Sequence, residues 1–267
     1  MQHYTNGSID DYWGGSIVPL KKAIRIIRDA LQGLVYVHLK GHIHRDIKPS
    51  NLLIKSNGDI VLSDFGLATR ITDAGEALPL GYLTHCAPEV FAEDRTSILT
   101  DIYGVGVTFY RLINGDAYLP EIQNSELEQA IIDGNYPDRN RYRLYIPKSI
   151  KRVINKALHV LPENRFSSAL QMLRAIERIK IYTDWEEIEE DNSIIWRGLF
   201  KRAKYKIERT VLSNGAIRIS TYRSAKGSSI ERQCHALSKR FRERDNTDKR
   251  IAKLLQSFTN GRPLVRL

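Results

Sequence analysis

Apolar residues recur at helical spacing along the first two thirds of the chain. Between residues 19 and 40 they return every three or four positions, which predicts a long amphipathic helix. Residues 101–114, DIYGVGVTFYRLIN, are apolar on nearly every side, a pattern typical of a buried central helix. Further helices are predicted near residues 124–133, 148–159 and 166–180.

Two short extended segments interrupt this helical pattern near its start. Residues 52–55 and 60–63 flank the turn sequence SNGD, which predicts a small β-hairpin. Neither an internal repeat nor a low-complexity run is visible in the chain. Because predicted helices occupy most of the other positions, we expect residues 1–181 to form one mainly helical α+β domain.

Charge divides the chain more sharply than the helical pattern does. From Trp196 to the C-terminus there are 19 Lys and Arg residues against 5 Asp and Glu residues. Residues 182–195, YTDWEEIEEDNSII, hold six acids and no base, whereas the preceding residues are close to neutral. We therefore predict an acidic linker at residues 182–195 and a separate basic domain over residues 196–267.

The basic region has a pattern of its own. Residues 205–212 and 216–222 alternate between apolar and polar side chains on either side of an Asn-Gly pair, the strongest short-range signal for a β-hairpin. Two basic helices are predicted near residues 228–243 and 247–258. This region is therefore expected to be a small α+β domain made of a hairpin and two helices.

Composition restricts the cellular compartment. No stretch approaches the ~20 apolar residues of a membrane span, and the N-terminus lacks the basic and apolar regions of a signal peptide. The two cysteines, Cys86 and Cys234, form neither a CxxC ligand pair nor a disulfide framework. We expect free thiols, a cytoplasmic location and no membrane partner.

Three short motifs follow one another in the first half of the chain. Residues 44–54 read HRDIKPSNLLI, Asp64-Phe65-Gly66 follows after a short interval, and Ala87-Pro88-Glu89 comes next. One DFG triplet arises easily by chance, but three motifs in this order and spacing do not. On these residues, positions 1–181 resemble the large, C-terminal lobe of a eukaryotic-type serine/threonine protein kinase.

The resemblance implies phosphoryl transfer from ATP, with Mg²⁺, to Ser or Thr hydroxyls of a protein substrate. Asp46 would accept the proton of the hydroxyl and orient it, and Lys48 would contact the γ-phosphate. Asn51 and Asp64 would hold Mg²⁺, which prefers hard oxygen ligands. Leu53 would form the apolar floor under adenine. Taken singly, Asp and Asn residues of this kind more often cap turns.

Other matches to the family imply structural roles. His44 and Phe65 fit an apolar stack that links the two motifs. Asp101 resembles the aspartate that holds the backbone of the catalytic loop. Arg165 resembles the arginine that pairs with the glutamate of the third motif, here Glu89.

The sequence departs from the family pattern in two places. No G-x-G-x-x-G loop, V-A-I-K-like lysine or partner glutamate precedes His44, and residues 1–13 resemble the hinge between the two kinase lobes. Either an N-terminal lobe is encoded upstream of Met1, or the short chain is a degenerate kinase. The expected partner is therefore the missing N-terminal lobe or another protein that covers the open ATP face. In the substrate-binding loop, Tyr82 and His85 stand where the family pattern has threonine and tyrosine.

Two hypotheses therefore stand beside the enzyme. A pseudokinase or kinase remnant would act through its surface as a protein-binding module. Residues 196–267 resemble no family, but their basic residues could neutralise the phosphates of DNA or RNA, or they could dock on an acidic protein surface.

Overall fold

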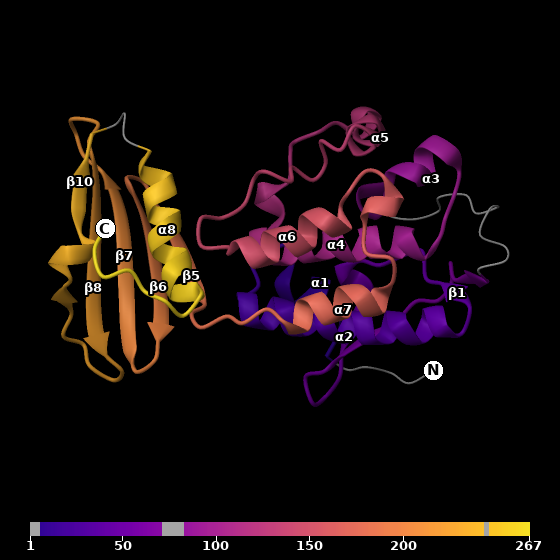
Figure 1. The fold of residues 1–267 in the computed structure, drawn as a ribbon, viewed down its shortest axis with the longest axis horizontal. Coiled ribbons are helices and arrows are strands. Elements are labelled where there is room, and N and C mark those ends of the chain that lie inside the picture. Colours follow the sequence, from indigo (N-terminus) through magenta and orange to yellow (C-terminus); the bar gives the residue numbers. More distant parts are fainter. Residues whose placement is uncertain (1–5, 71–82, 243–245) are drawn as a thin grey trace. The chain divides into compact units, whose positions relative to one another are not determined.

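The computed structural model describes residues 6–70, 83–242 and 246–267. The chain forms two compact units. The first comprises Met1–Tyr142 and Lys148–Ile179, and the second comprises Arg143–Pro147 and Lys180–Leu267. Figure 1 shows that helices dominate the first unit and that a single sheet dominates the second.

The first unit contains the helices that the apolar spacing predicted. Of the apolar residues at this spacing in α2, Leu20, Ile27, Leu31 and Leu34 are buried, whereas Ile24 and Val35 are half-buried. This helix packs against α4 and α7. The remaining predicted helices are also confirmed, with bounds that differ by a few residues. The helices of this unit are α1 (Ile9–Trp13), α2 (Leu20–Leu39), α3 (Pro88–Glu93), α4 (Ile98–Asn114), α5 (Asn124–Ile132), α6 (Lys148–Ala157) and α7 (Ala169–Glu177).

Helix α4 is the buried central helix, and it supports a loop that contains Ile47. A Cβ atom at Gly104 would lie 3.2 Å from the Cβ atom of Ile47 and 3.3 Å from its carbonyl oxygen. A larger residue at position 104 would therefore push this loop away. One turn later, the Thr108 hydroxyl donates a hydrogen bond to the Ile47 carbonyl at 3.3 Å.

Two small antiparallel sheets complete the first unit. Strand β1 (His42–Ile43) pairs with β4 (Thr69–Arg70). Strands β2 (Leu52–Ile54) and β3 (Ile60–Leu62) form the predicted hairpin, with Leu52 opposite Leu62. This register brings the residues that precede β2 and those that follow β3 to the same end of the hairpin.

The second unit is an antiparallel sheet with one helix. The sheet has the order β10-β8-β7-β6-β5, and β9 also pairs with β8. Figure 1 shows the helix α8 lying along the sheet. The elements are β5 (Trp185–Glu190), β6 (Ser193–Phe200), β7 (Ala203–Val211), β8 (Ile217–Ala225), β9 (Arg232–Gln233), β10 (Lys239–Phe241) and α8 (Thr247–Thr259).

The predicted acidic linker at residues 182–195 is instead part of this sheet. It contains β5 and the beginning of β6, which pair along their length. Trp185 is buried, and Glu187 is held by an ion pair with Arg143 and by a 2.5 Å hydrogen bond from the indole of Trp196. A cross-strand partner, Trp196, and an ion-pair partner outside the sheet, Arg143, override the low strand propensity of glutamate, so composition alone gave the wrong prediction here.

The first of the two predicted basic helices is also wrong. Residues 228–243 contain β9, a short 3₁₀ turn and β10 rather than a helix. Both strands pair with β8, which is long enough to receive them one after the other. The predicted hairpin is confirmed as β7 and β8, and the second predicted helix is confirmed as α8. The unit is therefore richer in sheet than the sequence indicated.

Aromatic rings join α8 to the sheet. The Phe258 ring lies 5.8 Å from the Trp185 ring, 5.6 Å from the Phe200 ring and 4.6 Å from the Tyr205 ring, measured between ring centroids. Phe258 itself is 1% exposed. This one helical residue therefore contacts rings from three neighbouring strands or their ends.

The described residues include both cysteines and the helices α1 to α8. Cys86 and Cys234 are both free thiols, as predicted. Within residues 6–70, 83–242 and 246–267, each helix is too short or too polar to cross a lipid bilayer.

Replacing Phe258 by alanine is expected to destabilise the second unit by about 3–5 kcal/mol, because the truncation leaves a cavity among three aromatic rings. Urea unfolding followed by tryptophan fluorescence measures this, since Trp185 and Trp196 lie in the same unit. The control variant Val265→Ala, at a residue that is 89% exposed, should change little. Equal stabilities of the two variants would contradict the packing role of Phe258.

Candidate active site

A compact cluster of polar side chains surrounds Asp46 in the loop between β1 and β2. The Lys48 ammonium lies 2.7 Å from Asp46 Oδ2. The Asn51 amide Nδ2 donates to the same Oδ2 and to the Asp46 carbonyl, each at 2.8 Å. Asp46 and Asn51 are buried, whereas Lys48 is partly exposed. The described residues therefore engage one carboxylate oxygen of Asp46 and leave Oδ1 open.

The backbone before Asp46 is held by a buried carboxylate on α4. Asp101 accepts hydrogen bonds from the backbone N–H of His44 at 2.9 Å and of Arg45 at 2.7 Å. His38 also contacts it, at 2.8 Å through Nε2. Arg45 has a φ of 72°, a left-handed conformation that costs a bulky residue about 1–3 kcal/mol. Asp101 thus holds the loop in the way that the sequence predicted.

His44 connects this loop to the segment after β3. Its Nε2 lies 3.0 Å from the Ser63 carbonyl, and its ring contacts the Phe65 ring at 4.9 Å in an edge-on geometry. Burial lowers the pKa of His44, and the nearby Asp101 carboxylate opposes this effect. The predicted contact between His44 and Phe65 is present, although Phe65 is half exposed.

Oxygen atoms of Asn51 and Asp64 lie at one end of the β2–β3 hairpin. Ser63 donates from its backbone N–H at 2.9 Å and from its hydroxyl at 3.0 Å to the Asn51 carbonyl, which places Asp64 next to this end. Since Asn51 Nδ2 faces Asp46, its Oδ1 is free to act as a ligand. Asp64 has a φ of 61°, and its Oδ1 accepts from the Gly66 N–H at 3.2 Å. Two hard oxygen donors of this kind fit Mg²⁺.

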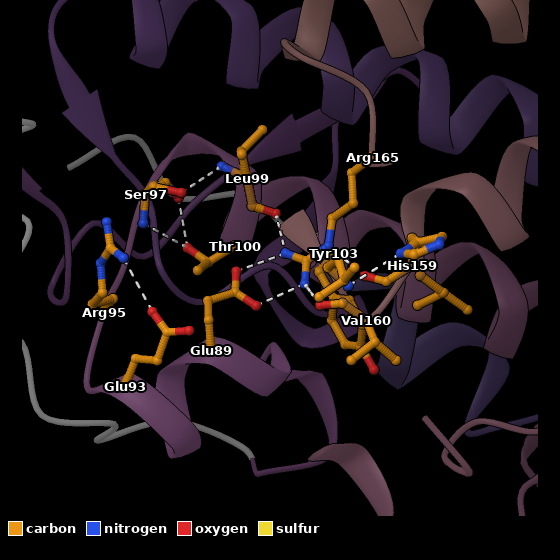
Figure 2. Close-up of polar contacts among 12 residues, drawn as sticks. Glu89, Glu93, Arg95, Ser97, Leu99, Thr100, Tyr103, His159, Val160 and Arg165 are labelled. Atoms are coloured by element: carbon orange, nitrogen blue, oxygen red, sulfur yellow. Dashed lines mark hydrogen bonds and ion pairs between the residues drawn. The ribbon is translucent and has the colours of Figure 1, made fainter. Parts of the chain in front are cut away.

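A buried ion pair lies at the start of α3. Arg165 Nη1 and Nη2 donate to the two carboxylate oxygens of Glu89, each at 2.6 Å (Figure 2). The guanidinium also donates to the carbonyls of His159, Leu99 and Val160 and lies 4.9 Å from the Tyr103 ring. Because the remaining donors of Arg165 are satisfied, the pair anchors α3 firmly.

Comparison with known proteins agrees with this geometry. The family model for the protein kinase domain matches residues 1–176. The chain belongs to the protein kinase family. The match includes the loop around Asp46, the hairpin with Asn51 and Asp64, and the anchor between Glu89 and Arg165.

Several curated relatives are bacterial serine/threonine-protein kinases. PknB of Mycolicibacterium smegmatis is 31% identical over 173 residues, which cover 62% of this chain and 27% of the relative. PknB of Mycobacterium tuberculosis is 30% identical over 171 residues, with the same coverage of each chain. PknL of Mycobacterium tuberculosis is 31% identical over 169 residues, which cover 61% of this chain and 41% of the relative. The chain thus spans less than half the length of these kinases.

The structure brings most of the predicted site residues together. Asp46, Lys48 and Asn51 are in direct contact, and Asp64 follows Ser63, which is bonded to Asn51. Leu53 is half-buried and forms an isolated bridge with Ser8. Tyr82, noted as a departure from the family pattern, lies outside the described residues.

A contact near the site, between buried His85 and half-buried Arg111, was missed by sequence reasoning. His85 Nε2 lies 3.4 Å from the Arg111 guanidinium, and its Nδ1 lies 3.1 Å from the Thr84 hydroxyl. Because arginine can only donate, Nε2 accepts and Nδ1 carries the proton. Burial, and then the charges of Arg111 and Lys48, hold the pKa of His85 well below its usual value. Position 85 therefore holds a neutral ring that is hydrogen-bonded to Arg111 of α4.

Cys86 is a second group that the sequence did not connect to the site. Burial raises the pKa of its thiol to about 11, and the negative charge of Asp46 adds to this effect. Lys48 opposes the shift but does not outweigh it. The thiol is therefore protonated at neutral pH, which argues against a nucleophilic role.

Replacing Glu89 by glutamine is expected to cost about 3–5 kcal/mol of stability, because it leaves the buried Arg165 charge without its carboxylate. The matched control is Glu93→Gln in the same helix, where the partner Arg95 is exposed and the expected loss is below about 1 kcal/mol. Thermal or urea unfolding followed by circular dichroism measures both. A loss at Glu89 no larger than that at Glu93 would contradict the anchor.

Stability is expected to fall as the pH drops from 7 to 5, because unfolded histidine takes up a proton near pH 6.5 while folded His85 stays neutral. His44 acts in the same direction. In His85→Gln, the slope of the unfolding free energy against pH should decrease by up to about 1.4 kcal/mol per pH unit. The control His235→Gln removes an exposed ring and should keep the slope. An unchanged slope in His85→Gln would show that His85 is not buried in its neutral form.

Proposed function

We propose that this chain carries the phosphoacceptor side of a protein serine/threonine kinase, which transfers the γ-phosphoryl group of ATP to a Ser or Thr hydroxyl of a protein. The main support is the way in which neighbouring side chains contact the Asp46 carboxylate. Lys48 and Asn51 contact its Oδ2, and no described residue engages Oδ1, which would accept a hydrogen bond from the substrate hydroxyl. Such a base needs only to orient the nucleophile, because the transition state of phosphoryl transfer is loose.

The neighbouring groups suit the charge that this reaction handles. Lys48 is partly exposed and lies beside the base, where its ammonium can also contact a transferring phosphate. Asn51 Oδ1 and the Asp64 carboxylate would hold Mg²⁺, which neutralises phosphate charge when it is bound. Leu53, half-buried on β2, would lie under the adenine ring.

The names of the relatives and the identity of residue 48 indicate that the proposed kinase acts on Ser and Thr. The relatives are named serine/threonine-protein kinases, and the resemblance to that family implies a lysine at the position of Lys48. The G-x-G-x-x-G loop and the lysine that bind ATP from the opposite side are not among these 267 residues. An N-terminal lobe or a partner would complete the site. The free thiols support a cytoplasmic location.

A second candidate function is a pseudokinase that binds proteins through this lobe. It is favoured by the departures in the substrate-binding loop, where buried His85 occupies a tyrosine position of the family pattern. Such a protein would keep the fold and the Glu89–Arg165 anchor without transferring phosphate.

The test is transfer of labelled phosphate from ATP with Mg²⁺ to mixed Ser, Thr and Tyr peptides. We expect incorporation into Ser and Thr peptides, and a loss of at least about 100-fold in Asp46→Asn, because general-base positioning contributes about 10²–10⁴-fold. Asp64→Ala should lose activity and Mg²⁺ dependence together. The matched control is Asp59→Asn, at a hairpin residue paired with Arg25 on the surface.

The outcomes separate the two candidates. Equal activities of Asp46→Asn and Asp59→Asn would contradict the role of Asp46. No incorporation by the folded parent chain would reject the enzyme for these 267 residues and favour the binding module.

A further inference from the structure

The second unit carries the entire net charge of the protein. It contains 21 Lys and Arg residues and 11 Asp and Glu residues, whereas the first unit has equal numbers of each sign. Six of the acids lie between positions 184 and 191, on and around the edge strand β5. The excess of positive charge therefore falls on the rest of the unit.

A groove of about 1030 Å³ lies where β7 begins and β8 ends. Four cationic side chains line it: Lys201, Arg202, Arg223 and Arg232. No Asp or Glu of the described residues is part of its lining, and none of the four cations forms an ion pair with a described carboxylate. The groove is thus positively charged, and no described carboxylate in its lining neutralises that charge.

The strand register places two of these arginines together. Arg223 on β8 lies directly opposite Arg232 on β9, and Tyr205 on β7 lies on the other side of Arg223. Directly opposite residues project from the same face of a sheet, and like charges in this position are destabilising. An anion bound between the two guanidinium groups would remove this repulsion.

The turn between β6 and β7 supplies the other two cations. Lys201 has a φ of 55°, and the Arg202 carbonyl accepts a hydrogen bond from the Lys226 backbone N–H at 3.1 Å. The backbone of this turn is therefore tied to the end of β8, beside the arginine pair. The four exposed cationic side chains of the groove thus extend from backbone segments that are tied to one another.

We propose that this groove binds a phosphoserine or phosphothreonine side chain within a peptide segment. A phosphate dianion accepts paired hydrogen bonds from planar guanidinium groups, which suits Arg223 and Arg232. Ser228, in the turn after β8, offers a neutral hydrogen-bonding group in the same lining. Ile230, which is 69% exposed, gives the groove an apolar wall for a neighbouring peptide side chain.

The aromatic residues of the groove favour a peptide over a nucleic acid. Sequence-tolerant binding of single strands uses aromatic faces on which bases stack. The two aromatic rings in the lining, those of Phe200 and Tyr205, are instead packed against Phe258 of α8. The choice of a phosphorylated peptide also rests on the proposed function, because a protein kinase produces this chemical group.

The experiment measures binding to the full chain without ATP, by fluorescence polarisation. The probes are a pool of random 11-residue peptides with a fixed central phosphothreonine, the same pool with threonine, and a 15-residue oligothymidylate. The phosphothreonine pool should bind about 10- to 100-fold more tightly than the threonine pool, as expected for paired charge-assisted hydrogen bonds. Raising the salt concentration should weaken this binding.

A matched pair of double variants tests whether the phosphothreonine peptides bind in this groove. Arg223→Gln with Arg232→Gln should abolish the preference for phosphothreonine. Arg218→Gln with Arg240→Gln removes the same charge from another directly opposite arginine pair, on the other face of the sheet, and should keep the preference. Circular dichroism confirms that both variants are folded.

Three results would overturn the proposal. They are equal binding of the two peptide pools, equal losses in the two double variants, and tighter binding of the oligothymidylate than of the phosphothreonine pool. The last result would indicate a nucleic-acid surface instead. Because ATP is absent, Asp46→Asn should bind as the parent does, so failure of the kinase proposal and failure of this one remain distinguishable.

Discussion

The geometry of the candidate active site depends on the Asp101 carboxylate. It accepts hydrogen bonds from two consecutive backbone N–H groups and so keeps Arg45 in a left-handed conformation that this residue would otherwise leave. The next residue is Asp46, whose direction follows from that backbone. Asp101 is itself fixed because α4 is buried and because Gly104 lets the loop lie close against the helix. The hydrophobic core thus sets the position of the polar cluster.

The first unit could be predicted from the sequence because its signals are local. Helical spacing predicted α2, α4, α5, α6 and α7, and three residues of the motifs, Asp46, Lys48 and Asn51, are in contact in the structure. The contact between His85 and Arg111 could not be predicted, because no spacing rule connects a loop residue to a helix residue 26 positions later. Its burial, which determines that the ring is neutral, exists only after the chain has folded.

The second unit was predicted less well because its sheet depends on pairing between strands. The glutamates of β5 suggested a solvated linker, yet Glu187 is buried between Arg143 and Trp196. Residues 228–243 are polar and basic, and only their pairing with β8 makes them strands. By contrast, the β7–β8 hairpin carries its own turn signal and was predicted correctly.

The assignment of the five residues Arg143–Pro147 to the second unit limits how a protein of this kind could arise by gene fusion. They belong to the second unit although they lie within the kinase region of the sequence, so the chain passes between the units three times. A gene fusion that joined residues 180–267 to another kinase would supply Glu187 and Gln256 without the Arg143 side chain and the Leu144 carbonyl that they contact. Simple end-to-end recombination at residue 180 would therefore not transfer the second unit with all of its contacts.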